Sequence, residues 1–181
     1  MNQTLPKRAL LVMGNSMLSE QLSELEAHFD VIRLWKEKDP ENVLQVRKND
    51  IVAISSVFFV PVSRNLIENL PNLEIISQFA VGYDNIDLAA AKERGVSVTN
   101  TPDVLTDETA DTALSLLLAV SKRVCEGDIF VRVGKWANGP LPLGASLKNK
   151  TVGIVGMGRI GRAIAHRCEA FGMKILYQGP R

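Results

Sequence analysis

A glycine-rich segment near the end of the chain has the residue types and spacing of a turn that binds nucleotide phosphates. The apolar run 151–155 leads directly into Gly156, Gly158 and Gly161, and residues 162–171 have the pattern of a helix. After a strand, the first glycine permits a tight turn, the second leaves room for a pyrophosphate, and the third lets the helix pack closely. The helix N-terminus adds free N–H groups. We therefore predict a dinucleotide-binding turn made by Gly156, Met157, Gly158, Arg159, Ile160 and Gly161.

The next strand, at 174–178, carries the choice between the two nicotinamide cofactors. NAD-selective sites place an Asp or Glu about 20 residues after the first glycine, where it binds the ribose hydroxyls. This chain has Gln178, Gly179 and Arg181 there, and no acid follows Glu169. Without a carboxylate a 2′-phosphate is not repelled, and an arginine can pair with it. We predict that NADP(H) is favoured over NAD(H), with a solvated terminal Arg181 as the alternative.

Composition excludes several other classes of protein. The chain has 181 residues with Lys+Arg 21 and Asp+Glu 20, a formal net charge of +1, which argues against a nucleic-acid partner. No apolar run approaches the ~18 residues of a membrane span. Cys125 and Cys168 are far apart and have no neighbouring histidine at metal-ligand spacing, so we expect reduced thiols and no metal site. A cytoplasmic protein is the expectation.

The first hundred residues must form the elements that position other functional groups beside this turn. Apolar runs indicate strands at 8–13, 31–34, 50–55, 73–79 and 96–99. Amphipathic segments between them indicate helices at 18–28, 41–47, 63–70 and 86–94. The first of these helices places Leu18, Leu22, Leu25 and Phe29 on one face. Strands that alternate with helices predict a parallel sheet with right-handed crossovers.

A different element joins this part to the glycine-rich turn. Residues 106–124 indicate one long helix, with Thr106 as its cap and Asp107 and Glu108 in the first turn, where the helix dipole favours negative charge. Apolar residues lie nearly all round it, which is typical of a helix buried between two bodies. The Gly- and Pro-rich segment 134–144 indicates a loop.

Several motifs in a fixed order now resemble one family over nearly the whole chain. They are VGYDNID at 81–87, VTNTP at 98–102, TAD at 109–111, GKW at 134–136 and the segment 147–161. Together they resemble the D-isomer-specific 2-hydroxyacid dehydrogenases, particularly the glyoxylate/hydroxypyruvate reductase branch. The resemblance implies an α/β fold: a flavodoxin-like parallel-sheet substrate domain at 1–104, a connecting helix at 105–125, and the first, incomplete part of a Rossmann dinucleotide-binding domain at 126–181.

The resemblance also assigns roles to residues. It implies that the backbone of Val81 and Gly82 holds the substrate carboxylate, and main-chain N–H groups after a buried strand suit an anion. It places Thr109 near the nicotinamide, and it implies a homodimer through the long helix and the Trp136 region. Asp111 stands where many relatives have Glu, a departure with no assigned effect. Residues 84–87 are interpreted as a turn and a helix cap.

The family's catalytic Arg, its His and the supporting acid all lie downstream of Arg181, so we predict no catalytic residue in this chain. His28 and His166 are interpreted as surface residues, and a solvated role is expected for Arg64. The predicted function is NAD(P)-dependent reduction of a small 2-oxo acid to the D-2-hydroxy acid, the chain being the front part of a longer enzyme and inactive alone. The alternatives are a non-catalytic dinucleotide-sensing protein of the corepressor type, and a relative that acts on phosphite, formate or phosphoglycerate.

Overall fold

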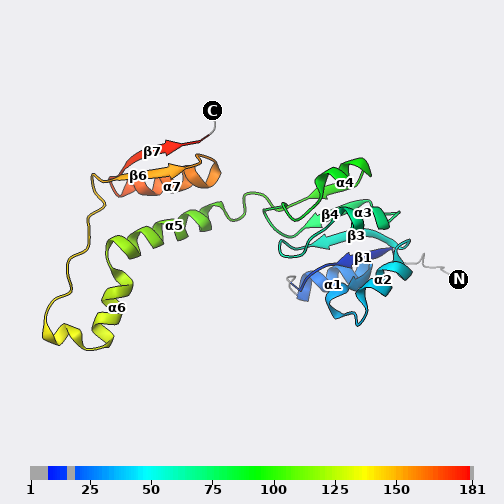
Figure 1. The fold of residues 1–181 in the computed structure, drawn as a ribbon, viewed down its shortest axis with the longest axis horizontal. Coiled ribbons are helices and arrows are strands. Elements are labelled where there is room, and N and C mark those ends of the chain that lie inside the picture. Colours follow the sequence, from blue (N-terminus) through cyan, green and yellow to red (C-terminus); the bar gives the residue numbers. More distant parts are fainter. Residues whose placement is uncertain (1–7, 16–18, 180–181) are drawn as a thin grey trace. The chain divides into compact units, whose positions relative to one another are not determined.

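The computed structural model describes residues 8–15 and 19–179, and the chain forms two compact units (Figure 1). The N-terminal unit is Met1–Pro102 and the C-terminal unit is Asp103–Arg181. The division expected from the sequence, at 104 and 125, stays a prediction. Two residues named above, Leu18 and Arg181, lie outside the described residues. No helix in the described part of the chain is both long and apolar enough to cross a membrane.

The N-terminal unit is a five-stranded sheet in the order β2-β1-β3-β4-β5, and every pairing in it is parallel. Its strands are β1 (Ala9–Val12), β2 (Asp30–Arg33), β3 (Ile51–Ser56), β4 (Ile75–Gln78) and β5 (Ser97–Thr99). Its helices are α1 (Ser19–His28), α2 (Pro40–Arg47), α3 (Arg64–Asn69) and α4 (Leu88–Glu93), with a 3-10 turn η1 (Leu34–Lys36). The predicted α/β fold with a parallel sheet is confirmed.

Helices cover both faces of this sheet, because the apolar residues of the strands alternate between two cores. On one face Leu22, Leu25 and Phe29 pack from α1 and the residue after it onto the central strands, as their spacing predicts. On the other face α2, α3 and α4 pack on a larger core that contains Ile54 and Ile76. The central strand β3 is buried along its whole length, as a strand covered on both sides must be.

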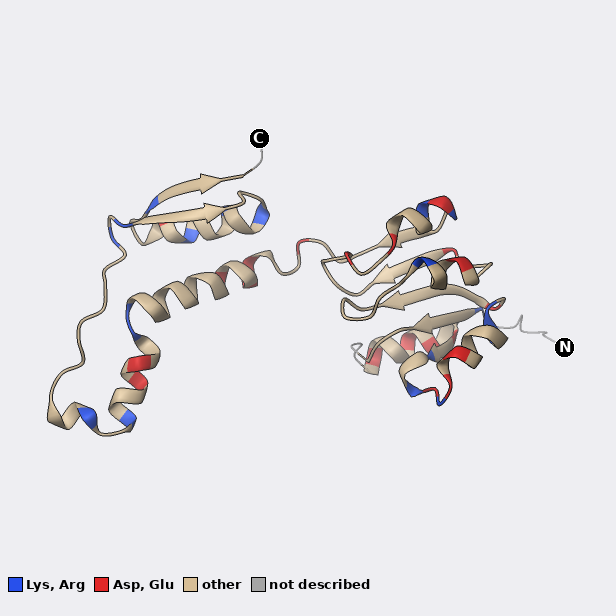
Figure 2. Ribbon diagram, viewed as in Figure 1, with Lys and Arg blue, Asp and Glu red and all other residues tan. Residues whose placement is uncertain are grey.

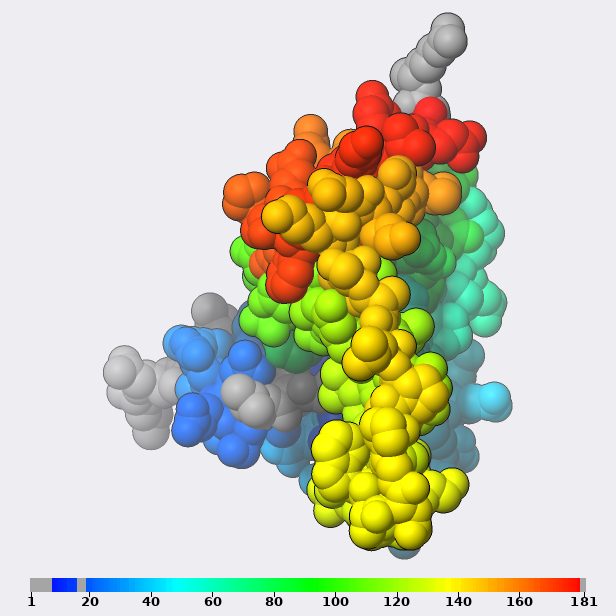
Figure 3. Space-filling model, turned by 90° about the vertical axis from the view of Figure 1, so that its left-hand side faces the viewer, coloured from blue at the N-terminus to red at the C-terminus, as the bar shows by residue number. Residues whose placement is uncertain are grey.

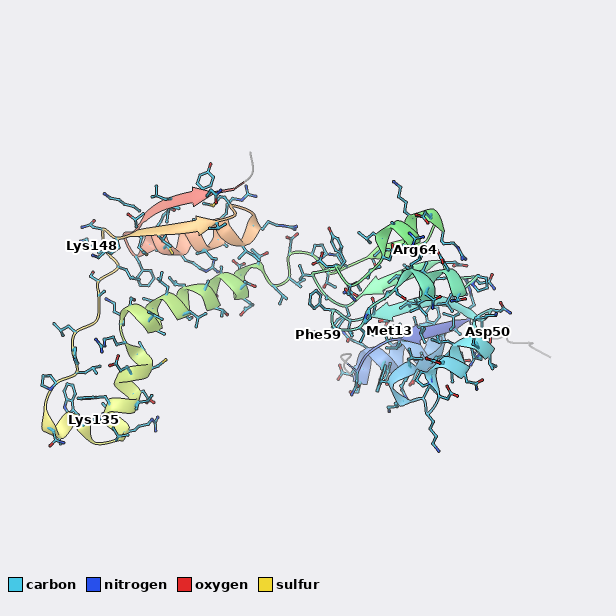
Figure 4. The ribbon with its side chains drawn as sticks, in the orientation of Figure 1. Met13, Asp50, Phe59, Arg64, Lys135 and Lys148 are labelled. Carbon is cyan, nitrogen blue, oxygen red and sulfur yellow. The ribbon has the colours of Figure 1, made fainter. Side chains whose placement is uncertain are left out.

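Because all five strands run parallel, their carboxyl ends lie at one edge of the sheet. The loops after β3, β4 and β5 therefore meet at this edge, which is where open α/β sheets bind ligands. Figure 4 shows Phe59, in the loop after β3, at this edge and Asp50 at the opposite one. The residues of interest in this unit, 78–87 and 100–101, all belong to these loops or to the ends of the strands before them.

The C-terminal unit contains α5 (Thr106–Ser121), α6 (Val124–Arg132), a 3-10 turn η2 (Lys135–Asn138), β6 (Thr151–Val155), α7 (Arg159–Ala170) and β7 (Lys174–Gln178). Strands β6 and β7 pair in parallel, with α7 as the connection between them. Leucines of α5 pack with Cys168 and Met173 in a small core. Figure 2 shows acidic residues in the first turns of α5, and two of them, Asp107 and Asp111, form ion pairs with Arg167 of α7.

The prediction of one continuous helix at 106–124 is wrong. Helix α5 ends at Ser121, and α6 begins at Val124 after Arg123, which has a left-handed φ of 57° that breaks the helix. The sequence reading assigned no element to α6. Leu105, not Thr106, is the N-cap residue, and no side chain caps this helix. Val120, in the last turn of α5, is 80% exposed in this chain, and the expected burial of the helix between two bodies stays a prediction.

Residues 124–146 form an arm that extends from the layer of α7 and β6 and returns to it (Figures 1 and 3). The predicted loop at 134–144 begins with the 3-10 turn η2. Phe130 and Trp136 make an edge-to-face contact within the arm, and their ring centroids lie 6.4 Å apart, within the range of about 4.5–7 Å that such pairs prefer. The arm is tied back to α5 where the Ala145 N–H donates to the Ser121 carbonyl at 2.7 Å.

Candidate functional site

The turn between β6 and α7 has the geometry that a phosphate-binding turn requires. Gly156 follows β6 directly and has a φ of 91°, a backbone conformation that L side chains rarely adopt. Its N–H donates to the Gln178 carbonyl at 2.7 Å, which fixes the turn to the end of β7. The two parallel strands therefore hold the turn from both sides.

The third glycine of the motif is required by packing. A Cβ on Gly161 would lie 2.1 Å from the Gly156 carbonyl oxygen, so the first turn of α7 rests directly on the backbone of the loop. Gly158 is different, because a Cβ there would meet no described atom within 4 Å. This open space next to the backbone is where the motif predicts the pyrophosphate. The close packing expected at Gly161 is thus observed, and the pyrophosphate contact of Gly158 stays a prediction.

The N-terminus of α7 supplies main-chain N–H groups that can donate hydrogen bonds to an anion. Gly158 is the N-cap residue and offers no side chain to the first N–H groups of the helix, which remain free for an anion. Met157 is half-buried in the turn, whereas Arg159 and Ile160 are exposed. The Arg159 guanidinium forms an ion pair with Asp103, and both side chains are about 60% exposed. A surface pair of this kind is weak, so Arg159 is free to exchange its partner for a phosphate.

The end of β7 lies beside this turn, where the cofactor's adenosine ribose is expected. A Cβ on Gly179 would lie 3.9 Å from both the Gly156 Cα and the Met157 nitrogen. Gln178 and Tyr177 are exposed there. Thr109, predicted at the nicotinamide end, lies in the second turn of α5, and its hydroxyl donates to the Leu105 carbonyl at 2.7 Å. Its role stays a prediction.

The predicted carboxylate loop follows β4 in the N-terminal unit. Val81 and Gly82 are half-buried, and among the described residues their main-chain N–H groups have no acceptor. A Cβ on Gly82 would lie 3.0 Å from the Phe58 ring, so the close approach of that ring favours glycine. Two adjacent, unpaired N–H groups at the carboxyl edge of a parallel sheet can bind an anion.

A buried network of side-chain hydrogen bonds supports the loop that contains Val81 and Gly82. Gln78, only 1% exposed, accepts a hydrogen bond from the Ser56 hydroxyl at 2.5 Å. Its amide donates to the Gly82 carbonyl at 3.0 Å and to Asn85 Oδ1 at 2.8 Å. The Asn85 amide in turn donates to the carbonyls of Val57 and Val60. Sequence reasoning missed Gln78, although a polar residue on the buried face of an apolar strand is the signal that marks it.

The remaining charged and capping residues near this loop hold the fold together. Asp87 caps α4 by accepting from the Ala90 N–H at 2.8 Å, which confirms the interpretation of this segment as a turn and a cap. Arg64 bridges α3 and α4 through ion pairs with Glu68, Asp87 and Glu93. Its hydrogen bond to Glu93 raises the pKa of Arg64 and, together with their Coulomb attraction, lowers the pKa of Glu93. Arg64 is therefore already partnered, rather than simply solvated as expected.

Neither histidine lies at these sites. His28 is exposed at the end of α1, which runs antiparallel to the strands and so ends at the edge opposite Val81 and Gly82. His166 is exposed in the middle of α7, two turns beyond the phosphate-binding end. Both match the expected surface role. The described residues contain no cluster of His, Cys, Asp and Glu that could hold a metal ion.

Comparison with known proteins gives consistent matches. Residues 10–172 match the model of the D-isomer specific 2-hydroxyacid dehydrogenase catalytic domain. Glyoxylate/hydroxypyruvate reductase A of Arabidopsis thaliana is 47% identical over 167 residues, which is 92% of this chain and 53% of the relative. The chain spans about half the length of the curated relatives it matches.

Two solved structures support the same grouping. A 2-hydroxyacid dehydrogenase from Ketogulonicigenium vulgare aligns with a TM-score of 0.89 and 40% identity, over 96% of this chain and 54% of the other. An NADPH-dependent glyoxylate/hydroxypyruvate reductase from Sinorhizobium meliloti, in complex with NADP and malonate, aligns with a TM-score of 0.75 and 36% identity, over 97% and 55%.

Proposed function

Because the chain belongs to the D-isomer specific 2-hydroxyacid dehydrogenase family, we propose that this protein reduces a small 2-oxo acid, of the glyoxylate or hydroxypyruvate type, to the D-2-hydroxy acid. The observation that carries the proposal is the pair of N–H groups at Val81 and Gly82, which have no acceptor among the described residues and lie at the edge of the sheet where open α/β folds bind ligands. A substrate carboxylate is an anion of the right size for two adjacent donors. The relatives named as glyoxylate reductases support this substrate class.

In this proposal the C-terminal unit binds the dinucleotide and the N-terminal unit binds the substrate. The glycine turn at 156–161 binds the pyrophosphate of a nicotinamide dinucleotide, which supplies the hydride when bound. The free N–H groups of α7 and the Arg159 guanidinium neutralise the phosphate charge. Val81 and Gly82 fix the carboxylate, so that the adjacent keto carbon is held in one orientation. Holding two reactants in place lowers the entropic part of the barrier.

We also propose a preference for NADP(H) over NAD(H). The residues beside the turn at the end of β7, Gln178 and Gly179, carry no charge that would repel a 2′-phosphate. The Sinorhizobium meliloti relative, described as NADPH-dependent, supports this preference. A carboxylate at this position would instead favour the free ribose hydroxyls of NAD(H).

We assign the proton donor to none of residues 1–181. The two histidines are exposed; within its own unit, His28 lies at the edge of the sheet opposite the N–H pair, and His166 lies two turns beyond the N-terminus of α7. A proton donor must come within hydrogen-bond reach of the substrate oxygen. The 181-residue chain alone is therefore expected to bind the dinucleotide without reducing a 2-oxo acid.

A homodimer is the proposed assembly, and the arm is its proposed contact surface. The arm exposes an apolar set: Val124, Ile129, Val131, Val133 and Trp136, each 56–64% exposed. Exposed apolar residues gathered on one segment are typical of an interface. The cysteines are free thiols, which suits the proposed cytoplasmic location.

The test measures oxidation of NADPH and NADH by the protein expressed from its complete gene, with glyoxylate and hydroxypyruvate as substrates. We expect turnover of both acids and a higher kcat/KM for NADPH than for NADH. The 181-residue chain, measured in parallel, should bind NADPH in calorimetry without oxidising it. Tight NADPH binding without turnover of either acid by the complete protein would contradict the proposal and favour a non-catalytic dinucleotide-sensing role.

A further inference from the structure

We propose that Asn100 is a positioning residue for the substrate carboxylate: its side-chain amide holds the Val81 carbonyl and thereby aims the Gly82 N–H at the carboxylate. The inference rests on the proposed role of Val81 and Gly82. Asn100 follows β5 and is half-buried, and its Nδ2 lies 2.8 Å from the Val81 carbonyl oxygen. No role was predicted for it from the sequence.

The geometry of the peptide bond makes this contact directional. A trans peptide is planar, and its C=O and N–H point in opposite directions. The Val81 carbonyl and the Gly82 N–H belong to the same peptide plane. When Asn100 fixes the direction of that carbonyl, it also fixes the N–H on the side of the loop away from Asn100. The amide of Asn100 thus acts on the donor without touching the ligand.

The neighbouring peptide is held in a different way. The Ala80 carbonyl accepts from the main-chain N–H of Thr101 at 3.1 Å, and this directs the Val81 N–H away from Thr101, the residue next to Asn100. One donor of the pair therefore depends on a main-chain bond and the other on a side chain. Removing the Asn100 amide should release the Gly82 N–H and leave the Val81 N–H in place.

Because residue 82 is a glycine, the hydrogen bond from Asn100 is needed to fix the orientation of this peptide. Glycine rotates about its backbone bonds more freely than any other residue, so the plane between Val81 and Gly82 is not fixed by local sterics. The close Phe58 ring disfavours a larger residue that would restrict it. The next plane is already held, because Gln78 donates to the Gly82 carbonyl at 3.0 Å. Asn100 completes the set of bonds that orient the loop.

The experiment compares three variants in the complete, ¹⁵N-labelled protein: Asn100→Ala, Asn100→Asp and Asn72→Ala. Asn100→Asp keeps the size of the side chain and replaces its N–H donor by an acceptor. Asn72→Ala is the matched control, because the Asn72 amide also donates to a main-chain carbonyl, that of Asn49 at 2.7 Å, at the amino edge of the sheet. Oxamate is the carboxylate probe, and the amide signals of Val81 and Gly82 are followed during its titration.

We expect oxamate to shift both signals in the unchanged protein and in Asn72→Ala. In Asn100→Ala and Asn100→Asp the shift at Gly82 should be lost while that at Val81 remains. In steady-state assays of Asn100→Ala the KM for glyoxylate should rise about tenfold, the size of one impaired charge-assisted hydrogen bond, with kcat and the KM for NADPH within about twofold.

Other results overturn the inference in distinguishable ways. If oxamate shifts neither signal in the unchanged protein, the proposed carboxylate site fails, and the inference fails with it. If Gly82 shifts equally in both Asn100 variants, the site stands and Asn100 does not position it. If both signals lose their response in the Asn100 variants while Asn72→Ala behaves normally, Asn100 supports the whole loop rather than one donor.

Discussion

The two units of this protein both present unpaired main-chain N–H groups, yet they hold them by different means. In the C-terminal unit the donors belong to the start of α7, and glycines allow backbone to lie on backbone, as where Gly161 meets the Gly156 carbonyl. In the N-terminal unit side-chain amides hold the carbonyls of the loop: Asn100 reaches it from the end of β5, and Gln78, four residues before Gly82, is itself bonded to Ser56 at the end of β3. The first arrangement is local in sequence, whereas the second also depends on β3 and β5.

Because of this difference, the glycine turn and the loop after β4 should be disrupted by different kinds of substitution. The glycine turn should fail when a side chain is added at Gly161, because there is no space for one at that position. The loop after β4 should fail when a side-chain donor is removed, because a buried polar group then loses its partner. The two kinds of substitution therefore separate the two arrangements, and the following predictions use them in order of expected effect.

The largest effect is expected from Gly161→Ala. Its Cβ would lie 2.1 Å from the Gly156 carbonyl oxygen, so α7 must move away from the turn. We expect NADPH binding to be abolished in calorimetry, with a loss of about 2–3 kcal/mol in the free energy of unfolding, typical of overpacking.

Gly153→Ala on β6 is the matched control, since its Cβ would meet no described atom within 4 Å. Its free energy of unfolding should change by no more than about 0.5 kcal/mol, with NADPH binding retained. Normal NADPH affinity in Gly161→Ala would show that the contact between α7 and the turn is not needed.

A smaller effect is expected from Gln78→Leu, which keeps the approximate size of the side chain and removes its polar atoms. The Gly82 carbonyl and the side chains of Asn85 and Ser56 would each lose a partner behind the loop. We expect urea denaturation to give a free energy of unfolding lower by about 2 kcal/mol, together with a higher KM for glyoxylate. Gln45→Leu, on the exposed surface of α2, should change neither quantity appreciably. A stable Gln78→Leu protein with unchanged KM would mean that the loop does not depend on this network.

The smallest effect concerns the exposed ion pairs, one from each unit. Arg64 lowers the pKa of Glu93, and Arg123 lowers the pKa of Glu126. A carboxyl whose pKa is lower in the folded state stabilises the fold above its unfolded pKa, about 4.3, and this contribution is lost as the pH falls through the folded value. Glu93→Gln and Glu126→Gln should therefore each lower the denaturation midpoint slightly at pH 7, with the difference from the unchanged protein disappearing at low pH. A difference that grows on acidification would contradict this assignment.

Much of the fold followed from local patterns. The alternation of apolar runs and amphipathic helices predicted all five strands of the N-terminal unit, and burial on both faces accounts for the apolar runs of β1 and β3. The pattern failed at residues 106–124, where it predicted one long helix; α5 ends at Ser121, and a second helix, α6, begins at Val124. The break depends on the left-handed backbone conformation of Arg123. A glycine in the sequence would have indicated such a conformation, whereas an arginine does not.

The sequence by itself predicted the glycine turn at 156–161, because strand, glycines and helix are consecutive and each glycine's task is set by its own backbone. It also led to the hypothesis for Val81 and Gly82, through the resemblance of the motif around them. Only the tertiary structure decided how that loop is held. Asn100 meets the Val81 carbonyl because β4 and β5 are neighbours in the sheet and end at the same edge. Contacts between the ends of separate strands leave no spacing in the sequence, so their chemistry becomes visible only in three dimensions.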